Sequence, residues 1–121
     1  MNISVPVRTN HVLQELLSRV NGDAELAQLY VCTNKNAVDR SNMNDHGEVH
    51  IRIVANAALR LIRLLVGAQV TPSIVTDYGM TVEDAEVVVV LASCLHDVGM
   101  TIHREDHEHH SLVIAYPKAR Q

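Results

Sequence analysis

The chain has 121 residues, 47% of them hydrophobic, and a formal net charge of −4, which suits one globular domain with a single modest core. Aromatic residues make up only 2% of the chain, so the core must be aliphatic, and the stacking surfaces of single-stranded nucleic acid sites are lacking. The negative charge argues further against a nucleic acid polymer as partner. A small phosphorylated ligand remains compatible, because a metal ion can supply positive charge locally.

The two cysteines, Cys32 and Cys94, have neither the density of a disulfide scaffold nor the CxxC spacing of a zinc site. We therefore expect both to be reduced and buried. The N-terminus has no basic start followed by a long apolar stretch, and no segment approaches the ~20 apolar residues of a transmembrane helix. These features predict a cytoplasmic protein without a membrane partner.

Hydrophobic periodicity predicts helices along most of the chain, after an extended segment at residues 1–9. Asn10 is expected to cap a helix over residues 11–20. Asp23 is expected to cap a second helix that ends somewhere in residues 34–39.

The strongest helical pattern covers residues 46–66, with Asn44 or Asp45 as its cap. We expect its broad apolar face to pack into the core and its arginines to lie in solvent on the opposite side. The apolar positions are Val49, Ile53, Val54, Ala57, Leu61, Leu64 and Leu65, and the arginines are Arg52, Arg60 and Arg63. A linker is predicted over residues 67–80, because it begins with Gly67 and contains Pro72.

Thr81 and Asp84 have the spacing of a capping box, which predicts a helix of about fifteen residues ending near His96. The valines at 87–90 have local strand propensity, but the cap and the length favour a buried helix. A last helix is predicted over residues 105–117, ended by its proline. The whole chain, residues 1–121, is thus expected to form one all-α domain, a bundle of about five helices.

Five of the eight histidines lie in residues 91–111, together with the adjacent pair His96 and Asp97. Imidazoles beside carboxylates suit a metal centre with nitrogen and oxygen ligands. Adjacent helical residues point about 100° apart, so both can reach one ion only where the helix ends. Gly99 is expected to provide the backbone freedom for this. The competing interpretation is a helix-terminal histidine favoured by the dipole, followed by a turn aspartate.

A further ligand must come from elsewhere, and His46 and His50, one turn apart on the long helix, are the obvious donors. The segment that starts at His50 reads HIRIVA, the doublet lies in CLHDVGM, and residues 107–111 read HEHHS. Together and in this order, over residues 44–115, they resemble the HD superfamily of metal-dependent phosphohydrolases. The register of this resemblance selects His50 over His46.

The resemblance implies an HD-domain-like fold and one or two divalent ions per chain, drawn from Mn, Mg, Co, Ni, Zn or Fe. His50, His96 and Asp97 would hold the first ion, and Asp97 would bridge to a second ion held by His107. The implied reaction is hydrolysis of a phosphate ester in a nucleotide or another small phosphorylated metabolite, with Asp97 in the catalytic site. A solvated helix start is the alternative interpretation of His107.

Arg104, and with less support His103, are expected to contact the substrate phosphate on chemical grounds, without a family motif. The family's frequent lysine three residues after the doublet is replaced by Met100. The family's final metal-binding aspartate is also lacking, because no Asp or Glu follows Glu108. We expect the chain to be the N-terminal part of a longer domain, the alternative being a degenerate member.

Two other functions stay open. Some HD-fold proteins use a di-iron site for oxygen chemistry, and a histidine-rich site would serve that chemistry too. A degenerate domain would instead act as a non-catalytic metal-binding or interaction module. A homodimer is a candidate assembly. His46 could lie beside the site or only in a helix start, and at least one of His109 and His110 is expected to be exposed.

Overall fold

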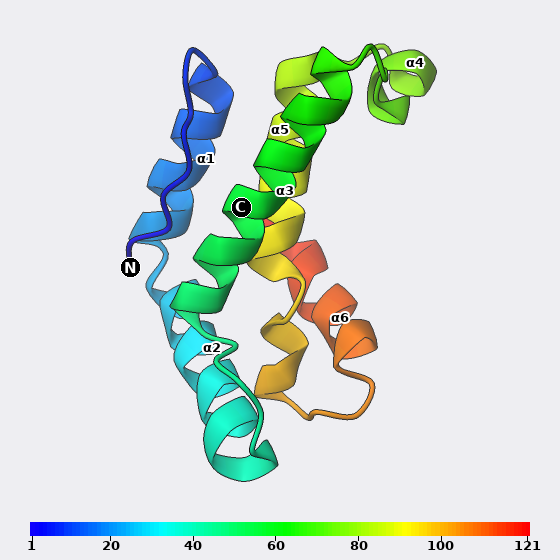
Figure 1. Ribbon diagram of the computed structural model, residues 1–121. Coiled ribbons are helices and arrows are strands. Elements are labelled where there is room, and N and C mark those ends of the chain that lie inside the picture. The colour runs from blue at the N-terminus through cyan, green and yellow to red at the C-terminus, as the bar shows by residue number, and fades with distance from the viewer.

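The computed structural model describes residues 1–121 and contains helices but no strand (Figure 1). The α-helices are α1 (His11–Gly22), α2 (Ala24–Asn34), α3 (Glu48–Gly67), α4 (Ser73–Tyr78), α5 (Val82–Leu95) and α6 (His107–Ala119). A π-helical segment, η1 (Lys35–Arg40), continues α2, and a 3-10 turn, η2 (Val98–Thr101), follows α5. The all-α prediction is confirmed. The short α4 lies in the stretch that was expected to be a linker.

The predicted caps set the helix starts. Asn10 and Asp23 each accept a hydrogen bond from the backbone amide three residues further on. Thr81 and Asp84 form a complete capping box. Because each of these side chains satisfies an amide that the helix leaves unpaired, the starts of α1, α2 and α5 fall where the sequence predicts them.

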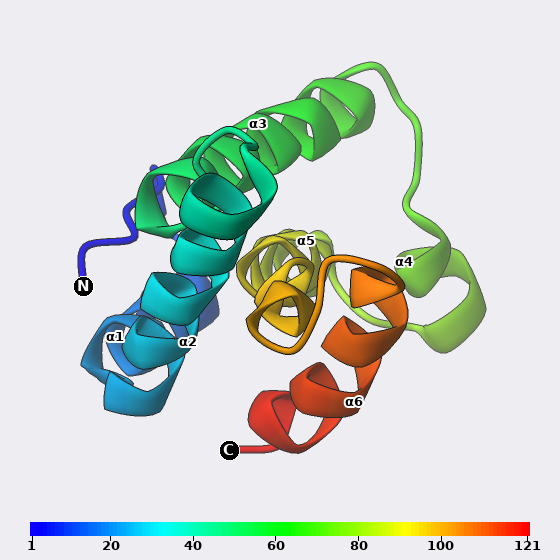
Figure 2. The ribbon, with the colours of Figure 1, turned by 90° about the horizontal axis from the view of Figure 1, so that it is seen from below.

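Helix α5 lies in the middle of the bundle, with α1 and α2 on one side, α3 on another and α6 on a third (Figure 2). The core cluster is aliphatic apart from Tyr30 and Cys94, and it draws on α1, α2, α3, α5, η2 and the N-terminal segment. The expectation that all four valines at 87–90 are buried is wrong in part, because Val90 is buried while Val88 is 46% exposed. None of the helices combines the length and hydrophobicity needed to cross a membrane.

Helix α3 buries a different face from the one predicted. Ile51, Ala55 and Leu59 are the residues of α3 that are fully buried. The predicted apolar face is largely exposed, as at Ile53 (62%) and Leu61 (58%). Aliphatic residues occur almost all round this helix, so periodicity identifies it as a helix without choosing its inner face.

Arg63 is the second correction on α3, because it lies inside an ion pair and not in solvent. Its Nε and Nη2 donate to the Glu86 carboxylate at 2.7 and 2.9 Å, and its Nη1 donates to the Pro6 carbonyl at 2.6 Å. Both side chains of the pair are 12% exposed. Asn10 also donates to Glu86, at 3.0 Å. This network fastens the N-terminal segment and α1 to α3 and α5, and the hydrogen bond from Arg63 lowers the pKa of Glu86.

The end of α6 also differs from the prediction. Pro117 lies within α6, which continues to Ala119. A proline in the last turn removes only one amide from the helix ladder, so it weakens the helix there without ending it. Both cysteines are free, Cys94 buried and Cys32 partly exposed.

Candidate metal centre

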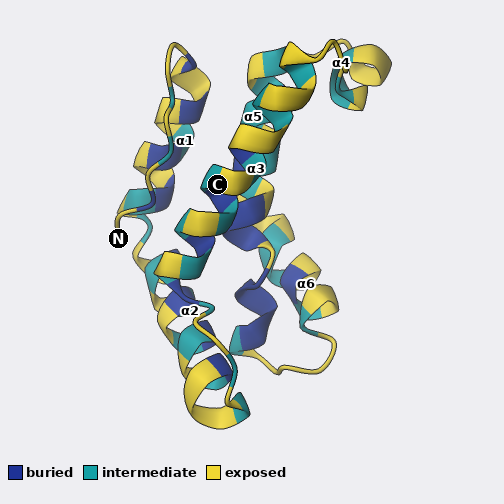
Figure 3. Ribbon diagram, viewed as in Figure 1, coloured by how far each residue is buried: buried dark blue, intermediate teal, exposed yellow.

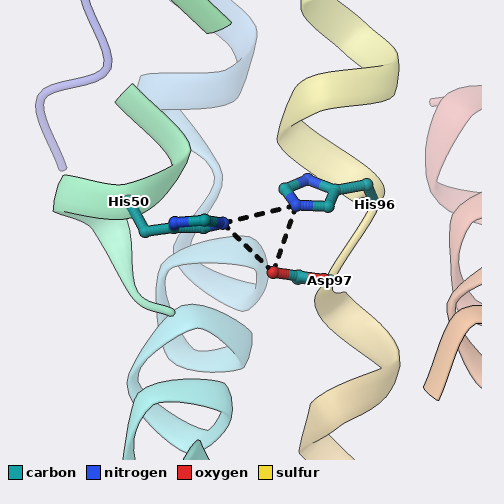
Figure 4. Close-up of side chains that lie close together, drawn as sticks. All are labelled: His50, His96 and Asp97. Carbon is teal, nitrogen blue, oxygen red and sulfur yellow. Dashed lines mark hydrogen bonds and ion pairs between the residues drawn. The ribbon is translucent and has the colours of Figure 1, made fainter. Parts of the chain in front are cut away.

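Three side chains from two distant helix ends converge at one point (Figure 4). His50 lies in the first turn of α3, and His96 and Asp97 directly follow α5. His50 Nε2 lies 3.4 Å from His96 Nε2 and 3.3 Å from Asp97 Oδ2. His96 Nε2 lies 3.1 Å from the same oxygen. One divalent ion could therefore take a ligand atom from all three residues with small side-chain adjustments.

The start of α3 is held so that His50 faces this point. Asp45 Oδ1 accepts hydrogen bonds from the backbone amides of Gly47 and His50, each at 3.2 Å, as a helix cap does. Asn34 Oδ1, at the end of α2, accepts from the His46 amide at 3.0 Å. The prediction of Asn44 or Asp45 as the cap is nevertheless wrong, because the helix begins at Glu48, two residues later than expected, and its N-cap position is Gly47.

His46 lies beside the three-residue group and not in it. Its ring stacks on His50 with the centroids 4.9 Å apart and the planes 27° apart. Its Nδ1 donates to the Asn44 carbonyl at 2.7 Å. His46 thus restricts the orientation of the His50 ring, which agrees with the selection of His50 by the sequence register.

His96 and Asp97 converge because they lie in the turn between the end of α5 at Leu95 and the start of η2 at Val98. Asp97 has φ −109° and ψ 3°, outside the helical region, and this turns its carboxylate toward the His96 ring. The expectation that Gly99 supplies the necessary freedom is wrong: its backbone angles are not in the left-handed region. A Cβ on Gly99 would lie 2.1 Å from the His107 carbonyl oxygen and 2.3 Å from the Ser111 nitrogen. Gly99 therefore permits α6 to pack directly on η2.

This packing brings His107 to the other side of Asp97. His107 Nε2 lies 3.6 Å from Asp97 Oδ1, whereas His50 and His96 face Oδ2. Gly99 N donates to Ser111 Oγ at 2.8 Å, which fixes the first turns of α6 against η2. The carboxylate of Asp97 thus lies between two histidines on one oxygen and one histidine on the other.

Helix α2 and η1 support the backbone around the site. Tyr30 donates its hydroxyl proton to the Cys94 carbonyl at 2.7 Å, in the last turn of α5. Asn36 Nδ2 donates to the carbonyls of Met100 and Thr101 at 2.8 and 3.0 Å. The sequence reasoning missed both residues. Their partners are main-chain atoms, which leave no pattern in the sequence.

The protonation of two rings is set by backbone carbonyls. His96 Nδ1 lies 2.8 Å from the Ser93 carbonyl, and His107 Nδ1 lies 2.9 Å from the Arg104 carbonyl. A carbonyl oxygen can only accept, so each Nδ1 carries the proton and each Nε2 is left to face Asp97. This arrangement of a ring N–H on a backbone carbonyl is the usual outer support of a metal-binding histidine.

The charges of these side chains shift one another's pKa values. The hydrogen bond to Asp97 raises the pKa of His96, against the opposing effect of burial. Burial acts to raise the pKa of Asp97, but its contact with His96 and the nearby imidazoles lower it overall. Burial lowers the pKa of His50. A buried carboxylate, 8% exposed, that faces imidazole nitrogens at 3.1 to 3.6 Å is a donor set suited to a divalent ion.

The remaining predicted site residues lie further out. Arg104 and His103 are exposed, and His103 Nδ1 accepts from the Glu105 amide at 3.1 Å. The Arg104 guanidinium forms no hydrogen bond or ion pair, and the structure does not bring it into contact with the three-residue group. Met100 is fully buried. His109 is exposed and His110 is partly exposed, as expected for at least one of them.

No carboxylate other than Asp97 joins the group. Glu108 is 78% exposed and lies 3.5 Å from His107 Nδ1, on the side of the ring away from Asp97. A metal held by His50, His96 and Asp97 would therefore have three protein ligands and positions open to water or substrate, as catalytic sites do.

Comparison with known proteins leaves the family of this chain undefined. No protein-family model matches the chain, and no solved structure matches it. An uncharacterized protein of Methanocaldococcus jannaschii is 40% identical over 79 residues, which is 65% of this chain and 30% of that protein. The chain thus matches less than a third of the length of this curated relative.

Proposed function

We propose that the protein is a metal-dependent phosphohydrolase of the HD type that acts on a nucleotide or another small phosphorylated metabolite. The convergence of His50, His96 and Asp97 carries this proposal, because three ligand atoms from segments 46 residues apart in the sequence lie within 3.1 to 3.4 Å of one another. Such a group is the minimum that holds a divalent ion with open coordination positions. The resemblance of the three histidine segments to the HD superfamily supports hydrolysis as the reaction.

His50, His96 and Asp97 would hold a divalent ion, which would supply Lewis-acid chemistry for phosphate ester hydrolysis by polarising the phosphate and lowering the pKa of water. The residues of the chain divide the remaining work. His50 and His96 supply neutral nitrogens, and Asp97 supplies the negative charge that compensates the ion. Asp97 Oδ1, which faces His107, offers a second ligand position on the far side of the carboxylate.

We propose that the guanidinium of Arg104 contacts the substrate phosphate. Its guanidinium is exposed and unpaired, so it is free to form a bidentate contact with phosphate oxygens. Its carbonyl accepts from the His107 ring, which ties its backbone to a residue of the site. Position 100 holds a buried methionine, so no cationic side chain at that position can contact the phosphate in place of Arg104.

The first test is metal content and metal-dependent activity. Purified protein would be loaded with Mn, Mg, Co, Ni, Zn or Fe, analysed for bound metal, and assayed for phosphate release from a panel of nucleotides and sugar phosphates. We expect bound metal and phosphate release in the wild type. His96→Ala and Asp97→Asn should lose both. His11→Ala is the matched control, because His11 is an exposed histidine at the start of α1 and not part of the three-residue group; this variant should lose neither metal nor activity.

Each alternative outcome has a meaning. Two irons per chain with a visible absorption band and no phosphatase activity would indicate that the protein is an oxygenase and not a hydrolase. Bound metal without any reaction would indicate a non-catalytic metal-binding module. Unchanged metal content in His96→Ala and Asp97→Asn would show that the ion lies elsewhere.

A further inference from the structure

The N-terminal segment and α3 form the walls of an open cleft of about 700 Å³. Two hydrogen bonds from α3 hold the main chain of the segment along the helix. Asn56 Nδ2 donates to the Ser4 carbonyl at 2.8 Å, and Arg63 Nη1 donates to the Pro6 carbonyl at 2.6 Å. The cleft therefore has two fixed walls, and its volume lies within the range of about 300 to 1,000 Å³ that small-molecule sites occupy.

The charged side chains that line this cleft are all arginines: Arg8, Arg60 and Arg63. Arg63 is compensated by its ion pair with Glu86. Arg8 and Arg60 are exposed and form no hydrogen bond or ion pair. The protein has a net charge of −4, so a cleft with two uncompensated guanidinium groups is a local concentration of the opposite charge.

Glu86 does not supply the missing partner of Arg8. Its Oε1 accepts from Arg63, and its Oε2 accepts from both Arg63 and Asn10. Both carboxylate oxygens are therefore already bound by other donors. An anion that enters the cleft would find the Arg8 guanidinium without a competing carboxylate.

The backbone at Arg8 is unusual for an arginine. Its φ is 53°, in the left-handed region, and it lies in a turn that is closed by a hydrogen bond of 3.0 Å from the Asn10 amide to the Val7 carbonyl. Figure 3 shows the turn that leads into α1 as exposed. Glycine or asparagine is the usual residue in this conformation, so the turn itself does not call for a long cationic side chain. Residues held in such conformations occur preferentially where a protein grips a ligand.

The arrangement of the cleft indicates the chemistry of its ligand. Arg8 and Arg60 belong to different walls, so the ligand must present oxygen atoms in more than one direction. A phosphate group does so, because its terminal oxygens point in different directions, whereas the two oxygens of a carboxylate lie along one edge. Ala57 and Leu64 are exposed and also line the cleft, which provides an apolar surface for the uncharged part of an organic phosphate.

The cleft is separate from the candidate metal group. Arg60 follows His50 by ten residues on α3, which places the two Cα atoms about 15 Å apart along the helix axis. None of His50, His96 and Asp97 lines the cleft. Binding in the cleft therefore requires no metal ion and does not depend on the proposed hydrolysis.

We propose that the cleft between the N-terminal segment and α3 binds an organic phosphate with two or more negative charges, through the guanidinium groups of Arg8 and Arg60. Arg63 acts as a positioning residue, because its bond to the Pro6 carbonyl holds the chain two residues before Arg8.

Isothermal titration calorimetry on the full chain tests the proposal. The protein would be kept in EDTA and about 150 mM salt, so that neither a bound metal nor weak surface attraction contributes. The probes are ATP, inorganic pyrophosphate and citrate. ATP and pyrophosphate should bind with a dissociation constant below about 1 mM, and citrate, of similar charge, should bind about 10-fold more weakly than pyrophosphate.

Arg8→Gln and Arg60→Gln should each weaken ATP binding by about 10-fold or more, because each removes a charge-assisted contact. Arg120→Gln is the matched control. It removes the same charge from an exposed arginine at the end of α6, outside the cleft, and should leave binding unchanged. Circular dichroism and urea unfolding should show that Arg8→Gln and Arg60→Gln are folded like the wild type, since neither side chain has a partner to lose.

Nuclear magnetic resonance provides a second measurement that reports on the side chains directly. In a titration with pyrophosphate, the Nε–Hε signals of Arg8 and Arg60 should shift and that of Arg120 should not.

Three results would overturn the proposal. The first is no binding of ATP or pyrophosphate at about 1 mM. The second is an equal loss of binding in Arg120→Gln and in the two cleft variants, which would indicate attraction by overall charge. The third is citrate binding as tight as that of pyrophosphate, which would show that the cleft does not select phosphate.

Discussion

Replacing Gly99 by alanine tests how the two halves of the site are joined. The added Cβ would lie 2.1 Å from the His107 carbonyl oxygen, 2.3 Å from the Ser111 nitrogen and 2.7 Å from Ser111 Oγ. Since carbon and oxygen do not approach closer than about 3.3 Å, the first turn of α6 must move by about 1 Å or more. Two of these three neighbours are backbone atoms, so no side-chain rotation relieves the overlap.

The expected cost has two parts. Overpacking costs about 1 to 3 kcal/mol, and loss of the 2.8 Å hydrogen bond from Gly99 N to Ser111 Oγ costs about 1 kcal/mol more. We therefore expect Gly99→Ala to lower the free energy of unfolding by about 2 to 4 kcal/mol. The same displacement would move His107 away from Asp97, from 3.6 Å now to roughly 5 Å, beyond the reach of a shared ion.

Urea unfolding followed by circular dichroism measures this cost. Ser111→Ala, which removes only the hydroxyl, separates the hydrogen bond and should cost about 1 kcal/mol. Gly22→Ala is the matched control: no atom lies within 4 Å of its added Cβ, so its stability should be unchanged or raised by up to about 1 kcal/mol. If Gly99→Ala is as stable as Gly22→Ala, the direct packing of α6 on η2 is wrong.

Three further predictions concern the ion pair of Glu86, the hydrogen bond of Tyr30 and the binding of a metal ion by Asp97. Glu86→Gln should destabilise the protein by about 3 kcal/mol in thermal or urea unfolding, because it leaves the Arg63 guanidinium, which is 12% exposed, without its anionic partner. A variant as stable as the wild type would show that this ion pair does not stabilise the fold. The pKa of Glu86 is lowered by its hydrogen bond from Arg63, so its contribution is present above its ordinary value of 4.5 and is lost as the pH falls through the lowered value; the acid limb of a stability-versus-pH curve should flatten in Glu86→Gln. Tyr30→Phe should cost about 1 to 2 kcal/mol by leaving the Cys94 carbonyl without its donor, and a cost near zero would mean that the bond at 2.7 Å contributes nothing. A divalent ion at a hundred times its dissociation constant should stabilise the wild type by about 2.7 kcal/mol in thermal unfolding, and Asp97→Asn should abolish this gain; a gain retained by the variant would contradict the assignment of Asp97.

The helices were predictable because their signals are local. Asn10, Asp23 and the pair Thr81 and Asp84 satisfy amides within three residues of themselves, and such spacing can be read directly from a sequence. The interactions that decide which face of α3 is buried are not local in the sequence. It depends on the side from which α5 packs, and an aliphatic helix gives no indication of that side.

The candidate site also combines features that the sequence predicts with features that depend on contacts between distant segments. The doublet of His96 and Asp97 and the register of His50 could be taken from motif order, and the structure brings these residues together. The role of Gly99 could not be predicted, because the atoms that exclude its Cβ belong to α6. The apposition of His107 and Asp97 depends on this same contact, which no spacing in the sequence specifies.

The hydrogen bonds from α2 and η1 have an evolutionary consequence. Asn36 and Tyr30 hold the main chain beside the site through carbonyl oxygens, which every amino acid possesses. Substitution of Met100 or Thr101 therefore leaves an acceptor in place, whereas substitution of Asn36 removes the donor for both. Homologous proteins should accordingly retain an amide at position 36. The side chains at positions 100 and 101 are constrained by other contacts, the burial of Met100 and the hydroxyl bonds of Thr101 to Thr33 and the Leu29 carbonyl.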